Sequence, residues 1–217
     1  DCDLQTLDVA DHAAVEAWAQ RVAAARGQVD IVINNAGVGL AGTVEENSYE
    51  DIQWLRGINF WGVVHGTRAF LPLLRKSSQG HLVNISSMFG LIAVPTQSAY
   101  NAAKFAVRGY TEALRLELED SNVHICCVHP GGISTNIARE SRGGDATPEE
   151  RDEQFREMTR TTAESAAAQI IRAVEKRKKR LLVGADARFV ALTAWLAPVN
   201  YMRLLAPFLK NALDMDK

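Results

Sequence analysis

The sequence predicts an α/β protein with a parallel sheet, because short apolar segments of strand length alternate with longer helical segments. Residues 4–9 alternate apolar and polar side chains, residues 12–26 carry an apolar stripe at helical spacing, and residues 29–34 form a short apolar run. A strand, a helix and a second strand in this order are the unit from which parallel sheets are built. We therefore expect helices packed on the faces of a parallel sheet.

The remaining elements continue this alternation. The expected elements are a long helix over 51–75, a buried strand over 81–86, a second long helix over 97–119, a strand over 122–128, a helix over 162–176 and a last strand over 181–184. A charged loop region covers 139–160, and Thr147-Pro148-Glu149-Glu150 within it predicts a capped helix start. An apolar segment at 185–217 ends the chain.

Composition places the chain among ordinary globular proteins. Its 217 residues are 47% apolar, which suits a single domain with a substantial core, and the formal net charge of −2 gives no attraction to nucleic acid or anionic membranes. Three cysteines are too few and too badly placed for a disulfide framework or a zinc site, so we expect no metal and a reducing compartment. No leader and no apolar run of membrane-spanning length is present, which favours a cytoplasmic location. The basic run 176–180 is expected to be solvated at a helix end.

Tyr100 and Lys104 are the first candidates for chemistry. They are four residues apart in an Ala-rich helical segment, so their side chains share one helix face. An ammonium close to a tyrosine favours the phenolate and lowers a pKa that is ordinarily about 10, which would make Tyr100 a general acid or base. Ser87 follows the apolar run 81–86 and could hold a substrate oxygen there. The alternative is a half-buried tyrosine beside a solvated lysine.

Other motifs in the sequence form an ordered series together with these residues. Asn34-Asn35-Ala36-Gly37 follows an apolar strand, Asn59 lies in the first long helix, and Pro130-Gly131-Gly132-Ile133-Ser134-Thr135 follows another strand. With Ser87 and Tyr100-x-x-x-Lys104, this series resembles the short-chain dehydrogenase/reductase family over residues 4–136. The resemblance implies a Rossmann-like, doubly wound parallel sheet in one domain. It also implies hydride transfer between NAD or NADP and a secondary alcohol or ketone.

The resemblance also implies a role for each matched residue. Tyr100 would exchange the hydroxyl proton, Lys104 would bind the nicotinamide ribose, Ser87 would hold the substrate oxygen, and Asn59 would order a water in a proton relay. The implied cofactor contacts are Asp8, Asn35, Ala36, Gly37, Tyr100, Lys104, Pro130, Gly131, Ile133 and Thr135. Two alternatives remain open at this point: Asp8 as a loop acid near a helix start, and Asn59 bonded locally to the helix backbone.

A literal G-x-G-x-x-G occurs at Gly37, Gly39 and Gly42, but we do not interpret it as the dinucleotide fingerprint. That fingerprint needs a helix opening at once, whereas residues 43–47 intervene and a capped helix start is expected at Ser48. The family's phosphate-binding glycines would precede Asp8. We therefore expect the first β-α-β unit to be missing from these 217 residues.

Substrate and partners are constrained less tightly. By resemblance, residues 139–160 would form a substrate lid. Ile92, Val94 and the apolar C-terminal segment suggest a pocket for an apolar substrate, although residues 195–213 could instead pack on a second subunit or lie on a membrane. Two broadly apolar helices predict a homodimer or homotetramer. His129 is expected to be a structural strand-end residue. The rival functions are a non-catalytic scaffold that keeps the fold, and lyase or epimerase chemistry.

Overall fold

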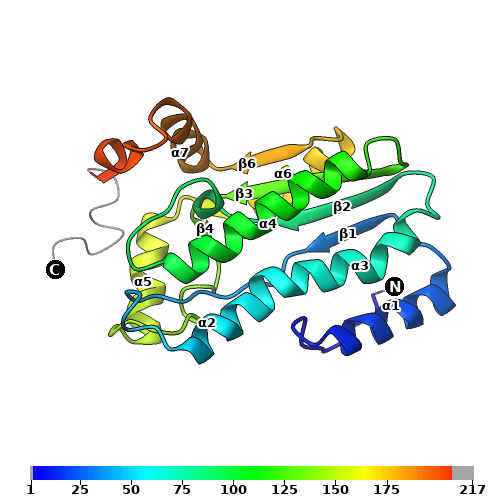
Figure 1. The fold of residues 1–217 in the computed structure, drawn as a ribbon, viewed down its shortest axis with the longest axis horizontal. Helices are drawn as coiled ribbons and strands as arrows, with labels where there is room; N and C mark the ends of the chain where they lie inside the picture. The colour runs from blue at the N-terminus through cyan, green and yellow to red at the C-terminus, as the bar shows by residue number, and fades with distance from the viewer. Residues whose placement is uncertain (1, 207–217) are drawn as a thin grey trace.

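A four-stranded parallel sheet forms the centre of the computed structural model, which describes residues 2–206 (Figure 1). Its order is β1-β2-β3-β6, with β1 at Ile31–Asn34, β2 at Gly80–Ile85, β3 at Val123–Pro130 and β6 at Arg180–Val183. All three neighbouring pairs are parallel, which confirms the predicted class. The four strand arrows point to one end of the molecule, where α5 and the first turns of α4 lie (Figure 1).

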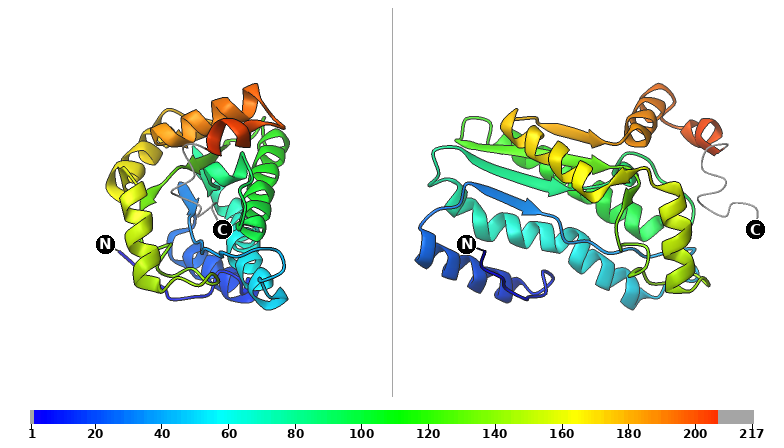
Figure 2. Two further views of the ribbon diagram at one scale, coloured as in Figure 1. Left: turned by 90° about the vertical axis from the view of Figure 1, so that its left-hand side faces the viewer. Right: turned by 180° about the vertical axis from the view of Figure 1, so that it is seen from behind.

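Helices surround this sheet, on its two faces and beyond the ends of its strands. They are α1 at His12–Arg26, α2 at Tyr49–Arg56, α3 at Gly62–Leu74, α4 at Ser98–Glu117, α5 at Pro148–Met158, α6 at Ala163–Glu175 and α7 at Ala185–Leu196. Helices α3 and α4 lie on one face, and the view from behind in Figure 2 shows α6 on the other. A small parallel pair, β4 at Ile133–Ser134 with β5 at Thr161–Thr162, lies near α5.

The core is split between the two faces by the alternation of β3. Val123 and Ile125 pack with Leu114 towards α4, whereas Cys126 and Val128 pack with residues of α6. A strand buried on both faces needs apolar side chains at successive positions, which explains the continuous apolar run that predicted it. None of the helices formed by residues 2–206 combines the length and apolar character needed to cross a bilayer.

One sequence expectation is corrected at the start of the chain, and another can be followed only in part at its end. Residues 4–9 form no strand, and Leu4 is 88% exposed, because alternation yields a strand only where a neighbour pairs with it. Among residues 2–206, β1 pairs only with β2, and its Ile31 and Ile33 remain 49% and 45% exposed. At the other end, the expected apolar extension begins with a regular helix, α7, while residues 207–217 lie outside the described part of the chain.

The expected helix over 51–75 has an interruption at its middle. A π-helical turn at Gly57–Trp61, here η1, separates α2 from α3 without ending the helical path. Such turns widen the helix locally and are frequent at functional sites. This one carries Asn59.

Candidate active site

Ser87, Tyr100 and Lys104 are brought together at the carboxyl ends of the strands. Ser87 follows β2 and caps the short 3₁₀ turn Met88–Gly90, here η2, while Tyr100 and Lys104 lie in the first two turns of α4. The Ser87 hydroxyl hydrogen-bonds to the Tyr100 hydroxyl, and Lys104 Nζ lies 5.7 Å from the centre of the Tyr100 ring. In open α/β sheets, ligands bind in the crevice outside these strand ends.

Lys104 is buried rather than solvated, which removes the alternative of an ordinary surface lysine. Its side chain is 3% exposed, and Nζ donates to the Ile85 carbonyl at 3.2 Å. A Cβ atom built on Gly37 would lie 3.4 Å from both Lys104 Nζ and Asn59 Oδ1, so the loop after β1 passes directly beside the ammonium. Burial disfavours the charged form and lowers the pKa of Lys104 to about 8.

The expected lowering of the Tyr100 pKa is wrong for the protein as this structure shows it. Burial raises the pKa of Tyr100, and the hydrogen bond with Ser87 opposes that rise only in part. The physical reason is geometric: Lys104 Nζ lies over the ring and bonds to the Ile85 carbonyl. Its charge therefore does not outweigh the desolvation of a phenolate.

Asn59 is fully buried, and it bonds to a distant segment rather than to its own helix. Its Nδ2 donates to the Val38 carbonyl and its Oδ1 accepts from the Val38 amide, both at 2.8 Å. The alternative of a local helix-backbone bond is therefore wrong. Asn59 holds the loop after β1 against η1, and its part in a proton relay stays a prediction.

The first asparagine of the Asn34-Asn35-Ala36-Gly37 segment supports the sheet. Asn34 Nδ2 donates to Asn84 Oδ1 at 2.8 Å, and Asn84 Nδ2 donates to Thr111 Oγ1 at 3.0 Å. This chain of amides links β1, β2 and α4 through buried hydrogen bonds. Asn35 and Ala36, by contrast, are exposed at the strand ends, as cofactor contacts would have to be.

The glycine-rich segment after β3 is held by the carboxylate of Asp186, a residue that belongs to no recognised motif. The Gly132 amide donates to Asp186 Oδ2 at 2.6 Å, and the Gly131 amide donates to the Val183 carbonyl at 2.9 Å. A Cβ atom on Gly131 would overlap the Asp186 carboxylate, which explains the glycine there. Ile133 begins β4 directly afterwards, and Thr135 follows it, half-buried.

Asn101 is a second residue that the sequence analysis missed. Its Nδ2 donates to the carbonyls of Phe89 and Ile92 at 3.1 and 3.3 Å, and its Oδ1 accepts from the Val94 amide at 3.1 Å. It thus holds the loop that follows Ser87. An amide in an apolar segment, the same signal that drew attention to Asn59, could have identified it.

The expected pocket residues Ile92 and Val94 do not face an open pocket. Both are buried and pack against Val190 of α7 and Leu205. The expectation that they line a pocket is corrected: they form the contact that joins the Ser87 loop to the C-terminal segment. Tyr201 strengthens this contact, because its hydroxyl accepts from the Ala93 amide at 3.0 Å.

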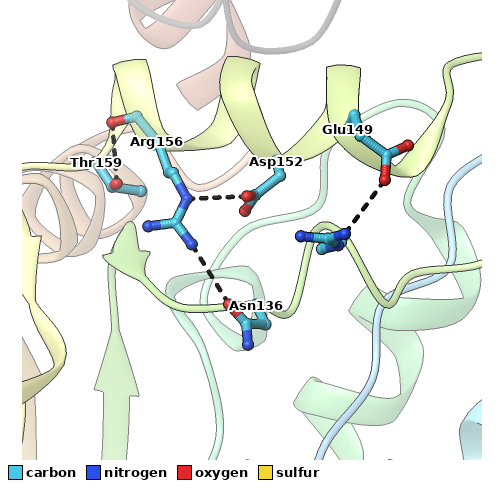
Figure 3. A network of polar contacts seen from close by, with 6 residues as sticks. Asn136, Glu149, Asp152, Arg156 and Thr159 are labelled. Carbon is cyan, nitrogen blue, oxygen red and sulfur yellow. Dashed lines mark hydrogen bonds and ion pairs between the residues drawn. The ribbon is translucent and has the colours of Figure 1, made fainter.

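The expected lid region contains the predicted helix start and several ion pairs. Thr147 and Glu150 form the capping box of α5, which confirms that prediction. Figure 3 shows Arg156 bonded to Asp152 and Asn136, and it shows Glu149 paired with an arginine, Arg139. The bond of Arg156 with Asn136 joins α5 to the segment that follows β4, whereas its pair with Asp152 lies within α5 and the Arg139–Glu149 pair is exposed.

Arg142 connects the same region to α2 and to the loop after β1. Its guanidinium pairs with Asp51 at 3.0 Å and lies 3.9 Å from the centre of the Trp54 ring, both on α2. Its backbone pairs with the loop after β1, where the Ala41 amide donates to the Arg142 carbonyl at 2.9 Å. No helix opens after Gly42 until Tyr49, so the interpretation of these glycines as a loop is confirmed.

Asp8 lies at a turn that leads into α1. Its Oδ1 accepts from the Ala10 amide at 2.9 Å. This is the bond of a loop acid near a helix start, the alternative left open above. Its contact with a cofactor adenine stays a prediction.

A doubly wound parallel sheet with a serine, a tyrosine and a buried lysine gathered at its strand ends is typical of nicotinamide-dependent oxidoreductases. The family model for short chain dehydrogenases matches residues 2–146. The chain therefore belongs to the short-chain dehydrogenase/reductase family.

Individual relatives agree with this assignment. The chain is 47% identical over 204 residues to SadH of Mycobacterium tuberculosis, named as an oxidoreductase, covering 92% of this chain and 74% of that one. It is 36% identical over 146 residues to a 3-ketodihydrosphingosine reductase of Bacteroides thetaiotaomicron, covering 67% and 54%. A solved family member from Burkholderia phymatum in complex with NAD is 29% identical, with a TM-score of 0.78 and coverage of 88% and 74%.

Proposed function

We propose that this chain is an NAD- or NADP-dependent oxidoreductase that interconverts secondary alcohols and ketones. The observation that carries the proposal is the cluster of the Ser87 hydroxyl, the Tyr100 hydroxyl and the buried Lys104 ammonium at the strand ends. A group that hydrogen-bonds an oxygen, beside a group that can exchange a proton with it, is what oxidation of a hydroxyl requires. A scaffold protein would have no use for a buried lysine with its desolvation cost.

Each residue then has a defined task. The nicotinamide, when bound, accepts the hydride in alcohol oxidation and returns it in ketone reduction. Tyr100 as phenolate takes the hydroxyl proton during oxidation and gives it back during reduction. Ser87 holds the substrate oxygen, Lys104 binds the nicotinamide ribose, and Asn59 connects the proton path to water.

The residues around the crevice fit a dinucleotide. Asn35 and Ala36 are exposed after β1, and the close approach of Gly37 to Lys104 leaves backbone rather than side chain facing the site. On the far side, Gly131 and Gly132 follow β3, and the Gly132 amide is held by Asp186. We assign the cofactor contacts to Asp8, Asn35, Ala36, Gly37, Tyr100, Lys104, Pro130, Gly131, Ile133 and Thr135.

The substrate is proposed to be apolar. Met88 and Phe89 follow Ser87 directly and pack against the same apolar cluster as Tyr201 and Met202 of the C-terminal segment, so apolar side chains gather next to Ser87. The similarity to a protein named 3-ketodihydrosphingosine reductase supports the same class. Glycerol, isopropanol, cyclohexanol and menthol form a series that tests this proposal, since turnover confined to glycerol would contradict it.

Assembly and location are further proposals. Trp61 after α2 and Phe105 on α4 are large, partly exposed apolar side chains on helices that flank the site. We propose that they face a second copy, in a homodimer or homotetramer, and light scattering after size-exclusion chromatography would show a monomer if this is wrong. The free thiols Cys2, Cys126 and Cys127 suit a reducing compartment, and we propose the cytoplasm.

The decisive experiment separates cofactor binding from chemistry. NADH and NADPH are titrated separately by calorimetry into the wild type and Tyr100→Phe, and alcohol oxidation is then measured for both proteins. We expect saturable binding of one cofactor in both and loss of oxidation by roughly a hundredfold or more in the variant. Tyr49→Phe, at a tyrosine 85% exposed, is the matched control and should keep full activity. Absence of binding, or full activity of Tyr100→Phe, would contradict the proposal.

A further inference from the structure

His129, near the end of β3, is completely buried, and its side chain hydrogen-bonds to the backbone of Ser87. Its Nδ1 lies 2.9 Å from the Ser87 carbonyl oxygen. A carbonyl can only accept, so Nδ1 carries the proton and donates it. Nε2 is then the unprotonated nitrogen, and it has no hydrogen-bond partner among residues 2–206.

Strand stability alone does not account for a histidine here. An imidazole with one unpaired buried nitrogen carries a desolvation cost that a valine or isoleucine at the same strand position would avoid. The side chain therefore contributes something that an apolar residue could not supply. What it supplies is the donor to Ser87.

The position of this hydrogen bond relative to the sheet indicates what it does. The pairing of β2 with β3 ends at Ile85 opposite Val128, and the last ladder bond runs from the Ser86 amide to the Val128 carbonyl at 2.8 Å. Ser87 lies one residue beyond that ladder. The His129 side chain continues the connection between the two strands for that one residue.

Apart from the bond between its hydroxyl and Tyr100, the other contacts of Ser87 come from its own loop. Its carbonyl also accepts from the Gly90 amide at 3.0 Å, and its hydroxyl accepts from the Phe89 amide at 3.1 Å. Those bonds shape the turn but move with it. The bond from His129 is the one that ties the serine peptide to the sheet.

We propose that His129 is a positioning residue, which holds the Ser87 peptide so that the serine hydroxyl stays within reach of Tyr100 and of a substrate oxygen. This inference rests on the role proposed above for Ser87. Burial lowers the pKa of His129 to about 4, in the presence of Arg108 and Glu112 on α4 and Arg180 on β6, so the Nδ1 donor is unchanged at neutral pH.

The test compares two substitutions of His129 and combines them with Ser87→Ala. His129→Leu removes the donor, whereas His129→Asn keeps an amide N–H close to the position of Nδ1. We expect His129→Leu to lower kcat for alcohol oxidation about tenfold or more, and His129→Asn to restore most of it. Cofactor affinity, measured by titration with NADH or NADPH, should change less than about twofold, since the hydrogen bond of the His129 side chain goes to Ser87 and not to an assigned cofactor contact.

The double variant decides whether the effect passes through Ser87. In the Ser87→Ala background, His129→Leu should change kcat by less than about twofold, because there is no hydroxyl left to position. An equal loss in both backgrounds would overturn the proposal, as would full activity of His129→Leu. If His129→Leu does not fold, His129→Gln, which moves the donor away from Ser87, takes its place in the same cycle. An inactive wild type would instead count against the proposed function.

Discussion

Burial acts on the two titratable residues of the site in opposite directions. It lowers the pKa of Lys104 to about 8 and raises the pKa of Tyr100, so both side chains are driven towards their neutral forms. A neutral tyrosine is ready to give a proton to a ketone oxygen. It must lose that proton before it can accept one from an alcohol.

The direction of the reaction should therefore show opposite pH dependences. We expect kcat/KM for alcohol oxidation to rise as pH increases from 6 to 10, because the phenolate fraction of Tyr100 rises with pH. Ketone reduction should fall over the same range. Initial rates in both directions with the preferred cofactor would measure this, and parallel profiles in the two directions would rule out Tyr100 as the group that titrates.

At the scale of elements, the features that depend on neighbouring residues were predicted well, whereas the pairing of distant segments was not. The capping box Thr147 to Glu150 needs only neighbouring residues, and it was found where the sequence placed it. Residues 4–9 have the alternation of a strand, but a strand also needs a partner. Asp186 lies 54 residues from Gly132, so no spacing rule could connect them.

The contact of Arg142 with α2 should matter for the whole of residues 139–160, the expected substrate lid. Arg142→Met removes both the ion pair with Asp51 and the contact with the Trp54 ring. We expect faster hydrogen exchange of the amides in 139–146 and a several-fold higher KM for the cofactor, with kcat nearly unchanged. Arg139→Met is the matched control: its ion pair with Glu149 is exposed on both sides and should contribute little. Equal effects of the two variants would contradict a special role of Arg142.

Asp186 should affect cofactor binding through the glycine segment after β3. Asp186→Ala leaves the Gly132 and Ala187 amides without their acceptor. Hydrogen bonds to a charged group contribute about 1.5–3 kcal/mol, so we expect cofactor affinity to fall roughly tenfold. Calorimetric titration measures it, with the exposed Asp145→Ala as control. Unchanged affinity would show that the segment holds its shape without the carboxylate.

At the scale of the molecule, the strand order explains why a site spread over the sequence could be predicted at all. Ser87 and Asn35 follow parallel strands and Pro130 ends one, and parallel strands end at one edge. Their contacts across that edge could not be predicted, because they depend on packing between distant elements. The bond of Asn59 to Val38 and the bond of His129 to Ser87 are of this kind.

The buried ammonium of Lys104 should be measurable as a cost to the stability of the whole fold. Its pKa falls from 10.5 in the unfolded chain to about 8 in the folded protein, a difference that corresponds to roughly 3 kcal/mol. Below pH 8 both states hold the proton and the full cost applies. Between pH 8 and 10.5 the unfolded chain binds more protons than the folded protein, so this contribution to stability improves as pH rises.

Lys104→Met, which has no charge to bury, isolates this effect. Below pH 8 we expect Lys104→Met to have a higher free energy of unfolding than the wild type. As pH rises to 10.5, the free energy of unfolding of the wild type should increase by about 2–3 kcal/mol relative to that of the variant. Urea denaturation of both proteins at pH 7, 9 and 10.5 measures the difference, with the exposed Lys76→Met as control. A difference that does not depend on pH would mean that water reaches the ammonium in the folded protein. Because the same variant should lose oxidation activity, the outcome would also show that the site keeps its lysine at the expense of stability.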